Sequence, residues 1–261
     1  MRELIRSAMS PLSDWRLLVL HLAGNALLFA AATGWLLIPE AHAWQLLVTA
    51  LGGLAILLAF AWLHCGTLAH GVNPTRETLH QDFCRSARHL PAFVLFAAVL
   101  GALMIWTSNY ADESSWKISG YFFTRLPQFL QRSLGEMRFH RWIELKFIAL
   151  TWFFLPALFL PFLAVAAHSG FRWRGLRCAL RAYARWKYWL AMAVASLVGI
   201  LLPCLLANWT PAHGLRKEMV SLALRLPAAY VLAILVWVMT SAVVGSILRP
   251  NLDDSGGNSV S

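Results

Sequence analysis

Charged residues are scarce in this sequence, and long parts of it have none. Asp, Glu, Lys and Arg make up 13% of the 261 residues, whereas an average soluble protein has about 25%. Hydrophobic residues make up 59%, and the mean hydropathy is +0.60. This composition excludes an ordinary water-soluble domain, which carries charge over its surface. Six stretches contain none of the four charged types: 17–39, 41–75, 89–111, 147–171, 188–215 and 226–248.

Carboxylates are missing from all six stretches, because none of the 12 Asp and Glu residues lies in them. Proton-coupled carriers use a carboxylate inside the membrane, and phosphotransfer enzymes hold a metal with clustered Asp residues. The sequence therefore argues against both classes. It also lacks a C-x-x-C pair and an H-E-x-x-H motif, so we predict no metal site, no cofactor and no catalytic residue.

The sequence does contain six apolar segments of membrane-crossing length. A helix needs about 20 apolar residues to cross the hydrocarbon core of a bilayer, and it satisfies its own backbone there. We predict an all-α, polytopic integral membrane protein with six transmembrane helices and with basic amphipathic helices at the interface. The transmembrane domain covers 17–248, with spans at about 17–37, 44–64, 90–108, 147–168, 188–208 and 222–248.

The distribution of Lys and Arg predicts the orientation. Cytoplasmic flanks carry an excess of these residues, and segment 1–16 and the links after the second and fourth spans are basic. We therefore place the basic N-terminal segment 1–16 and the polar tail 249–261 in the cytoplasm, next to a bacterial inner membrane or a plasma membrane. Segment 110–145 then becomes an extracytoplasmic amphipathic insertion, either a lid or a connector, although its own Lys and Arg residues oppose this orientation.

Residues 171–187 have the pattern of an interfacial helix, with arginines at helical spacing and a separate stripe of Trp, Leu and Tyr. Such a helix places its apolar stripe among acyl chains and its arginines near anionic headgroups, at roughly 1 kcal/mol each. We predict binding to anionic membrane lipids, and we assign the net charge of +10 to phospholipid rather than to nucleic acid. The general excess of Lys and Arg on cytoplasmic flanks would also explain these arginines without any lipid site. The candidate headgroup residues are Arg174, Arg177, Arg181 and Arg185.

Polar residues in or beside the spans form a second candidate site, because an ionisable side chain inside a bilayer needs a partner or water. His21 and Asn25 are four residues apart and share one helix face. An interhelical hydrogen bond worth about 0.6–2 kcal/mol explains such residues without a ligand. Arg225 either snorkels to the outer interface or points toward Asn208. The candidate intramembrane polar residues are His21, Asn25, His64, Asn208 and Arg225.

No motif names a substrate or a reaction. The leading prediction is a non-enzymatic membrane component, either an accessory subunit or a lipid-interacting scaffold, with a protein partner or a second copy of the chain as further candidate partners. The alternative is a transporter or permease for small molecules or lipids, because four prolines within spans, Pro156, Pro161, Pro203 and Pro227, each free a backbone carbonyl. An intramembrane enzyme or a metal- or haem-binding protein ranks third. A polar cavity that reaches the midplane of the membrane and is lined by Pro-broken helices would favour the transporter over the scaffold.

Overall fold

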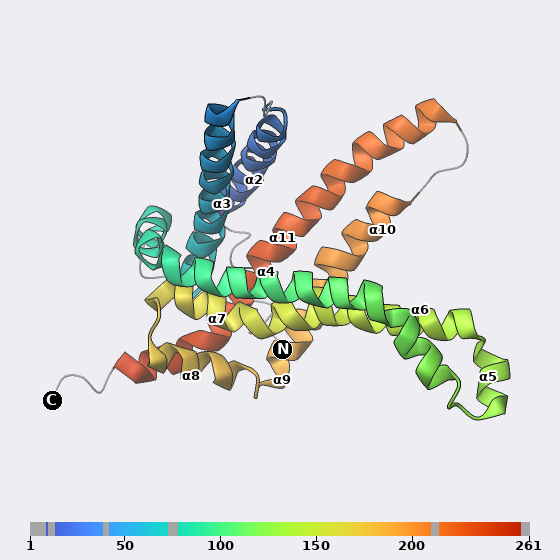
Figure 1. Ribbon diagram of the computed structural model, residues 1–261. Coiled ribbons are helices and arrows are strands. Elements are labelled where there is room, and N and C mark those ends of the chain that lie inside the picture. The colour runs from blue at the N-terminus through green and yellow to red at the C-terminus, as the bar shows by residue number, and fades with distance from the viewer. Residues whose placement is uncertain (1–8, 10–13, 39–41, 73–77, 210–213, 257–261) are drawn as a thin grey trace. The chain divides into compact units, whose positions relative to one another are not determined.

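A computed structural model describes residues 9, 14–38, 42–72, 78–209 and 214–256, and throughout these residues the chain is helical or irregular, without strands (Figure 1). The predicted all-α fold is confirmed. The elements are α2 (Trp15–Leu36), α3 (Ala43–Val72), α4 (Leu79–Phe123), α5 (Gln128–Leu134), α6 (Glu136–Ala149), the π-helix η2 (Leu150–Phe154), α7 (Leu155–Ser169), α8 (Trp173–Ala182), α9 (Trp186–Ser196), the π-helix η3 (Leu197–Leu201), α10 (Leu202–Asn208) and α11 (Leu215–Gly256).

Six helical segments of the described chain are long and apolar enough to cross a membrane, as predicted. The third of them, α4, is much longer than its predicted span. Its 45 residues measure roughly 67 Å, more than twice the hydrocarbon core of about 30 Å. Residues 109–119, beyond the apolar stretch, contain neither Gly nor Pro, and the helix continues through them and through Gly120 to Phe123. Segment 110–145 therefore consists of the end of α4, of α5 and of most of α6.

The chain divides into two compact units, one of residues 1–94 and 161–261 and the other of residues 95–160. In the first unit α11 is the central helix, and α2, α3, α8, α9, η3 and α10 pack against it. Apolar residues of α2, α3 and α11, together with one from the start of α4, form a small core. Its buried members are Leu17, Leu63, Phe83, Ile234 and Val238.

Helices α3 and α11 cross with their backbones in contact. A Cβ atom on Gly71 would lie 2.6 Å from the carbonyl oxygen of Ser241, and a Cβ on Gly245 would overlap the carbonyl of Gly71. Only glycine allows this approach, which gains close backbone packing where helices have no hydrophobic drive to associate. Beside the crossing, Arg249 donates from Nε to the carbonyl of Val72, the last residue of α3, at 2.9 Å. This bond satisfies one of the carbonyls left open at the helix end.

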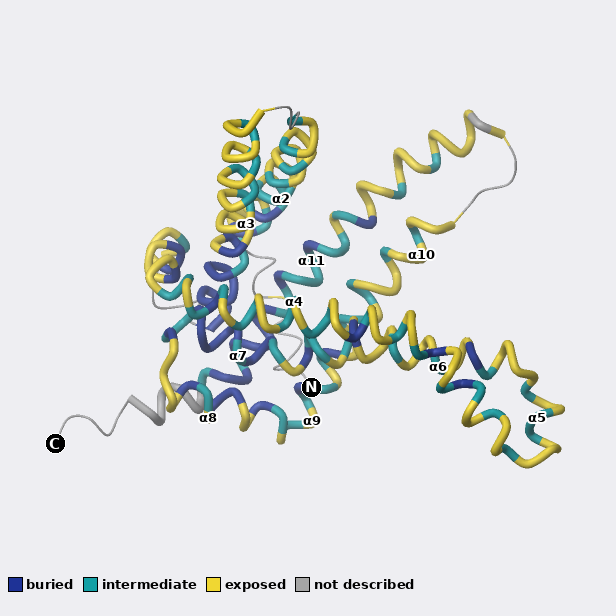
Figure 2. Tube along the Cα trace, viewed as in Figure 1, coloured by how far each residue is buried: buried dark blue, intermediate teal, exposed yellow. Residues whose placement is uncertain are grey.

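The first half of α3 and most of α2 leave large apolar side chains uncovered, whereas α3 is buried from residue 65 to residue 72 (Figure 2). Leu27, Phe29 and Leu57 each expose two thirds or more of their surface. A water-soluble protein rarely exposes so continuous an apolar area. Acyl chains would cover it in a bilayer, as expected for membrane-crossing helices.

The second unit is an antiparallel helical hairpin. The end of α4 faces α6 and η2, and side chains bridge the two sides at successive levels. Thr151 donates to Thr107 at 3.0 Å, and the rings of Tyr110 and Phe147 meet edge to face at 6.0 Å. Farther along the hairpin, toward α5, the rings of Trp116 and His140 stack with their centroids 3.7 Å apart.

Proline explains both π-helices. The backbone N–H of Leu155 bonds to Leu150, and that of Leu202 bonds to Leu197, so each turn contains one extra residue. A proline cannot donate to the carbonyl four residues earlier, and its ring clashes with that carbonyl. For Pro156 and Pro203 the carbonyls concerned belong to residues 152 and 199, the middle residues of η2 and η3. The wider π-turn relieves this clash.

Candidate functional site

One face of helix α8 consists of small, buried residues. Gly175, Cys178, Ala179 and Ala182 are buried, and at 100° per residue they share one side of the helix. A Cβ on Gly175 would meet the side chain of Val165 in α7, so small residues on this face allow α8 to lie against the bundle. Burial on this face also raises the pKa of the Cys178 thiol, while the neighbouring Arg181 opposes the rise.

The predicted headgroup arginines divide into two groups. Arg174, Arg177 and Arg181 are exposed along one flank of α8, next to the exposed side chains of Trp173 and Leu180. Arg185 lies beyond the helix and donates from Nη1 to the carbonyl of Ile247 in α11 at 2.6 Å. The first three arginines therefore form a surface row, whereas Arg185 ties the turn before α9 to α11.

His21 lies at the contact between α2 and α3 and is fully buried. The Thr67 hydroxyl donates to the carbonyl of Leu63 at 2.9 Å, so its oxygen is left to accept the short hydrogen bond from His21 Nε2. The other ring nitrogen, Nδ1, accepts from Asn25 Nδ2 at 3.2 Å. Both nitrogens are thus used by a neutral imidazole. The structure therefore places His21 and Asn25 in one hydrogen-bonded group that joins two helices.

His64 completes this group from α3. Its ring stacks on His21 at 5.5 Å and lies 5.1 Å from the ring of Trp237 in α11. His64 Nδ1 and Trp237 Nε1 are buried and have no hydrogen-bond partner among the described residues. Sequence reasoning missed Thr67 and Trp237. The only signal for Thr67 was its position three residues after His64, which puts both on one helix face.

Arg225 and Asn208 lie elsewhere. Arg225 donates from Nη1 to the carbonyl of Leu206 at 3.2 Å, and its guanidinium lies 5.6 Å from the ring of Trp209. Asn208 bonds to the carbonyl of Cys204 in its own turn. Arg225 therefore covers the carboxyl end of α10. It precedes Trp237 by about 18 Å along α11, so the five predicted polar residues do not form a single site.

A polar group of one histidine and two carboxylates, which the sequence did not predict, joins the ends of three helices. His70 near the end of α3 lies 2.6 Å from Asp82 in the first turn of α4 and 3.7 Å from Asp14, the N-cap residue of α2. His70 and Asp82 are both buried. A histidine between two carboxylates is a strong link in a low-dielectric setting. Its three members come from separate segments, so no spacing in the sequence reveals it.

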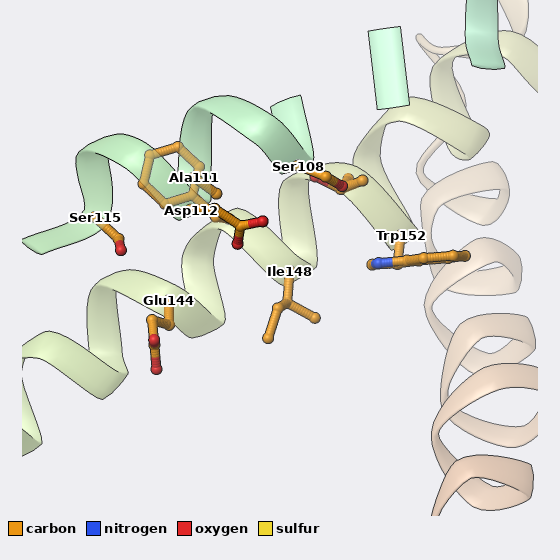
Figure 3. Close-up of a pocket in the computed structure, with 9 residues that line it drawn as sticks. Ser108, Ala111, Asp112, Ser115, Glu144, Ile148 and Trp152 are labelled. Atoms are coloured by element: carbon orange, nitrogen blue, oxygen red, sulfur yellow. The ribbon is translucent and has the colours of Figure 1, made fainter. Parts of the chain in front are cut away.

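The hairpin of the second unit contains a cavity of about 260 Å³ between α4 and the segment formed by α6 and η2 (Figure 3). Asp112 and Glu144 line it from opposite helices. The remaining lining is formed by Ser108, Ala111, Ser115, Phe147, Ile148, Thr151 and Trp152. Two of these residues, Thr151 and Trp152, belong to the π-helix that precedes Pro156.

Among the residues that the structure describes, no group of three or more His, Cys, Asp or Glu side chains has the arrangement of a metal site. Comparisons with protein-family models, with curated proteins and with solved structures each gave no match to the chain. Function must therefore be argued from the arginine row of α8, the polar group around His21 and the cavity of the second unit.

Proposed function

We propose that the chain is a non-enzymatic, multi-pass membrane protein that binds anionic phospholipid headgroups through α8 and acts as a lipid-interacting scaffold or accessory subunit. The observation that carries this proposal is the exposed row of Arg174, Arg177 and Arg181 on a helix whose opposite side packs into the bundle. Because α8 is already helical and packed against the bundle, binding through its arginines does not require a flexible segment to become ordered. At roughly 1 kcal/mol per basic residue near an anionic surface, three arginines supply about 3 kcal/mol.

The uses of the other polar residues support a structural role for the spans. His21 bonds to both Thr67 and Asn25, and Arg225 and Arg249 bond to carbonyls at helix ends. These bonds join helices and leave few groups for chemistry on a substrate. We propose cytoplasmic termini, since the basic segments 1–16 and 171–187 then lie on the side that favours them. The arginine row would face the inner leaflet of a bacterial inner membrane or plasma membrane, where anionic lipids concentrate.

The test is to replace the three arginines together by glutamine and to measure co-purified lipid. The full chain is extracted in mild detergent, and its bound lipids are compared with those of the host membrane by native mass spectrometry. We expect the wild-type protein to be enriched in phosphatidylglycerol or another anionic lipid and the variant to lose this enrichment. High salt should also weaken lipid binding by the wild-type protein, because salt screens the charges of exposed arginines.

A matched control removes the same charge elsewhere. Arg132, Arg138 and Arg141 are exposed in the hairpin of the second unit, and their replacement by glutamine should leave the enrichment unchanged. Equal lipid enrichment in the wild-type protein and the α8 variant would contradict the proposal. It would reduce the α8 arginines to determinants of topology.

A transporter remains the second candidate because one specific observation favours it. The cavity of the second unit is polar and is lined by the π-helix before Pro156, which is one of the features expected of a substrate pathway; the other is a position near the bilayer midplane. Transport requires access to the cavity from both sides of the membrane. A Ser115→Cys variant whose thiol reacts with membrane-impermeant reagents added from either side would favour a transporter over a scaffold.

A further inference from the structure

We propose that the cavity between α4 and α6 binds an ammonium group, carried either by the headgroup of a zwitterionic phospholipid or by a small free amine. The proposal is independent of lipid binding by α8. It rests on the charges, hydroxyls and aromatic rings that line this cavity and on its position along the two helices.

The cavity has negative charge that the described basic side chains do not neutralise. Asp112 is exposed and has no hydrogen bond or ion pair with any residue in the described ranges, and the Glu144 carboxylate lies 3.1 Å from His140 Nε2. Lys117, Arg141 and Lys146 are exposed in the same hairpin without bonding to either carboxylate. Two carboxylates facing one cavity attract a cation, which would supply the missing partner.

Ser115 provides evidence for a ligand that does not depend on the carboxylates. Its side chain is among the buried polar residues, with 5% exposure, and it lines the cavity on the side of α4 that faces α6 (Figure 3). The hydroxyl has no hydrogen-bond partner among the described residues. By contrast, Thr107 and Ser119 in the same helix donate to backbone carbonyls. The hydroxyl is accessible from the cavity, so a bound N–H donor can bond to its oxygen.

Aromatic rings favour an organic ammonium over a bare metal ion. Trp152 and Phe147 line the cavity together with Ile148, and aromatic faces attract ammonium groups through cation–π interactions, with Trp the strongest. Ca²⁺ needs six to eight oxygen ligands, and Mg²⁺ needs an octahedral set. The volume of about 260 Å³ lies just below the range of about 300–1,000 Å³ for drug-sized ligands. The cavity therefore suits a small cationic group.

The position of the cavity matches that of lipid headgroups. The charge-free stretch of α4 ends at Ala111 and that of the facing segment begins at Phe147, and both residues line the cavity. It therefore lies at the level where each helix leaves the hydrocarbon core. Trp152 is half exposed, as is common for Trp at this boundary.

His140 positions Glu144 for this role. The His140 ring is buried, lies 3.2 Å from the Ser119 hydroxyl through Nδ1 and 3.1 Å from Glu144 through Nε2, and stacks on Trp116. The side chain of Glu144 is half exposed and would otherwise move freely. We therefore regard His140 as a positioning residue for the carboxylate.

The test uses the full chain in detergent and in nanodiscs. Ethanolamine and tetramethylammonium chlorides are titrated by calorimetry in detergent, with NaCl and MgCl₂ as controls. The lipid arm measures by native mass spectrometry whether phosphatidylethanolamine or phosphatidylcholine is retained from mixed nanodiscs. We expect binding in at least one arm and no displacement by Na⁺ at equal concentration. Binding of free amine alone would assign the site to a soluble amine, and retention of lipid alone would assign it to a headgroup.

Asp112→Asn with Glu144→Gln should weaken binding by about tenfold or more, because charge-assisted hydrogen bonds are lost. The control Glu113→Gln with Glu136→Gln removes two exposed carboxylates of the same hairpin and should bind as the wild type does. Trp152→Leu should weaken tetramethylammonium more than ethanolamine, because a quaternary ammonium has no N–H to donate. Absence of binding in both arms, equal binding by the two double variants, or binding of Mg²⁺ alone would overturn the proposal.

Discussion

At the scale of single residues, the polar side chains of the spans work mainly as links between helices. The spacing of His21 and Asn25 predicts that they share a face, and the structure bonds them to each other. The sequence could not predict Thr67 as the partner of His21, because that contact depends on the offset between two helices. Hydropathy does not encode such an offset. The pairing of His70 with Asp82 could not be predicted either, because it also depends on how two helices are placed relative to each other.

Gly245→Ala should destabilise the protein by about 1–3 kcal/mol, the usual cost of overpacking a tight contact. The added methyl would overlap the carbonyl of Gly71 and force α3 and α11 apart. Thermal unfolding of the purified protein in detergent, followed by circular dichroism or by intrinsic fluorescence, measures the effect.

Gly101→Ala is the control for this substitution. Nothing lies within 4 Å of the Cβ position at Gly101, so alanine there should be neutral or stabilising by up to about 1 kcal/mol through its higher helix propensity. A variant at position 245 that unfolds at the same temperature as the control would contradict the close crossing.

At the scale of secondary-structure elements, the sequence pattern of α8 predicts its arginine row but not the face that packs into the protein. Four small or weakly polar residues define that face, and none of them has a strong hydropathy signal. Cys178 lies on it and reports on its burial.

Cys178 should react slowly with iodoacetamide, because burial raises its pKa and only the thiolate is reactive. The raised pKa favours the neutral thiol in the folded state. Its contribution to stability is therefore present below the unfolded pKa and is lost as the pH rises through the folded value. We expect alkylation of Cys178 to lag behind that of the exposed Cys84 near pH 8 and to accelerate at higher pH. Equal rates, measured by peptide mass spectrometry, would place the α8 face in solvent.

Pro156→Ala should remove the cause of η2 and allow a regular α-helix through residues 150–154. Stability should stay equal or rise, since proline costs about 3 kcal/mol relative to alanine inside a helix. Ammonium binding should fall, because Thr151 and Trp152 would rotate relative to α4. Pro161→Ala in α7, where no π-turn occurs, should leave binding unchanged. Loss of binding in both variants would show that the π-turn has no specific part in shaping the cavity.

At the scale of the whole molecule, composition predicts most of the fold. Six charge-free stretches correspond to six membrane-length helices, because an apolar stretch of that length has few other stable environments. The ends of the helices were harder to predict. Helix α4 continues through polar residues beyond its apolar part and passes Pro91, Gly101 and Gly120 without ending, so neither hydropathy nor the position of Gly and Pro marks its end. The cavity arises from side chains on two such extended ends, which hydropathy marks only as polar.

The predicted orientation of the chain in the membrane can be tested with fused reporters. A reporter that is active only in the cytoplasm should function when fused after Ser261 and fail when fused at residues 110–120, because the basic flanks favour cytoplasmic termini. Fusions after residues 40 and 210 provide matched outer positions and should also fail. The reverse pattern would invert the orientation, and activity at all positions would mean that a proposed span does not cross.

The two π-helices also bear on how this chain tolerates changes in length. A π-turn contains one residue more than an α-turn, so η2 and η3 each store a single surplus residue within a membrane span. Deleting one residue from 150–154 or from 197–201, with Pro156 or Pro203 also replaced by alanine to remove the ring clash, would restore a regular turn and keep the helix faces on both sides in register. The same deletion elsewhere in a span would turn every following side chain by about 100° and expose its buried face to lipid. The described part of the chain therefore has two places within its spans where a one-residue deletion can be absorbed once the following proline is replaced.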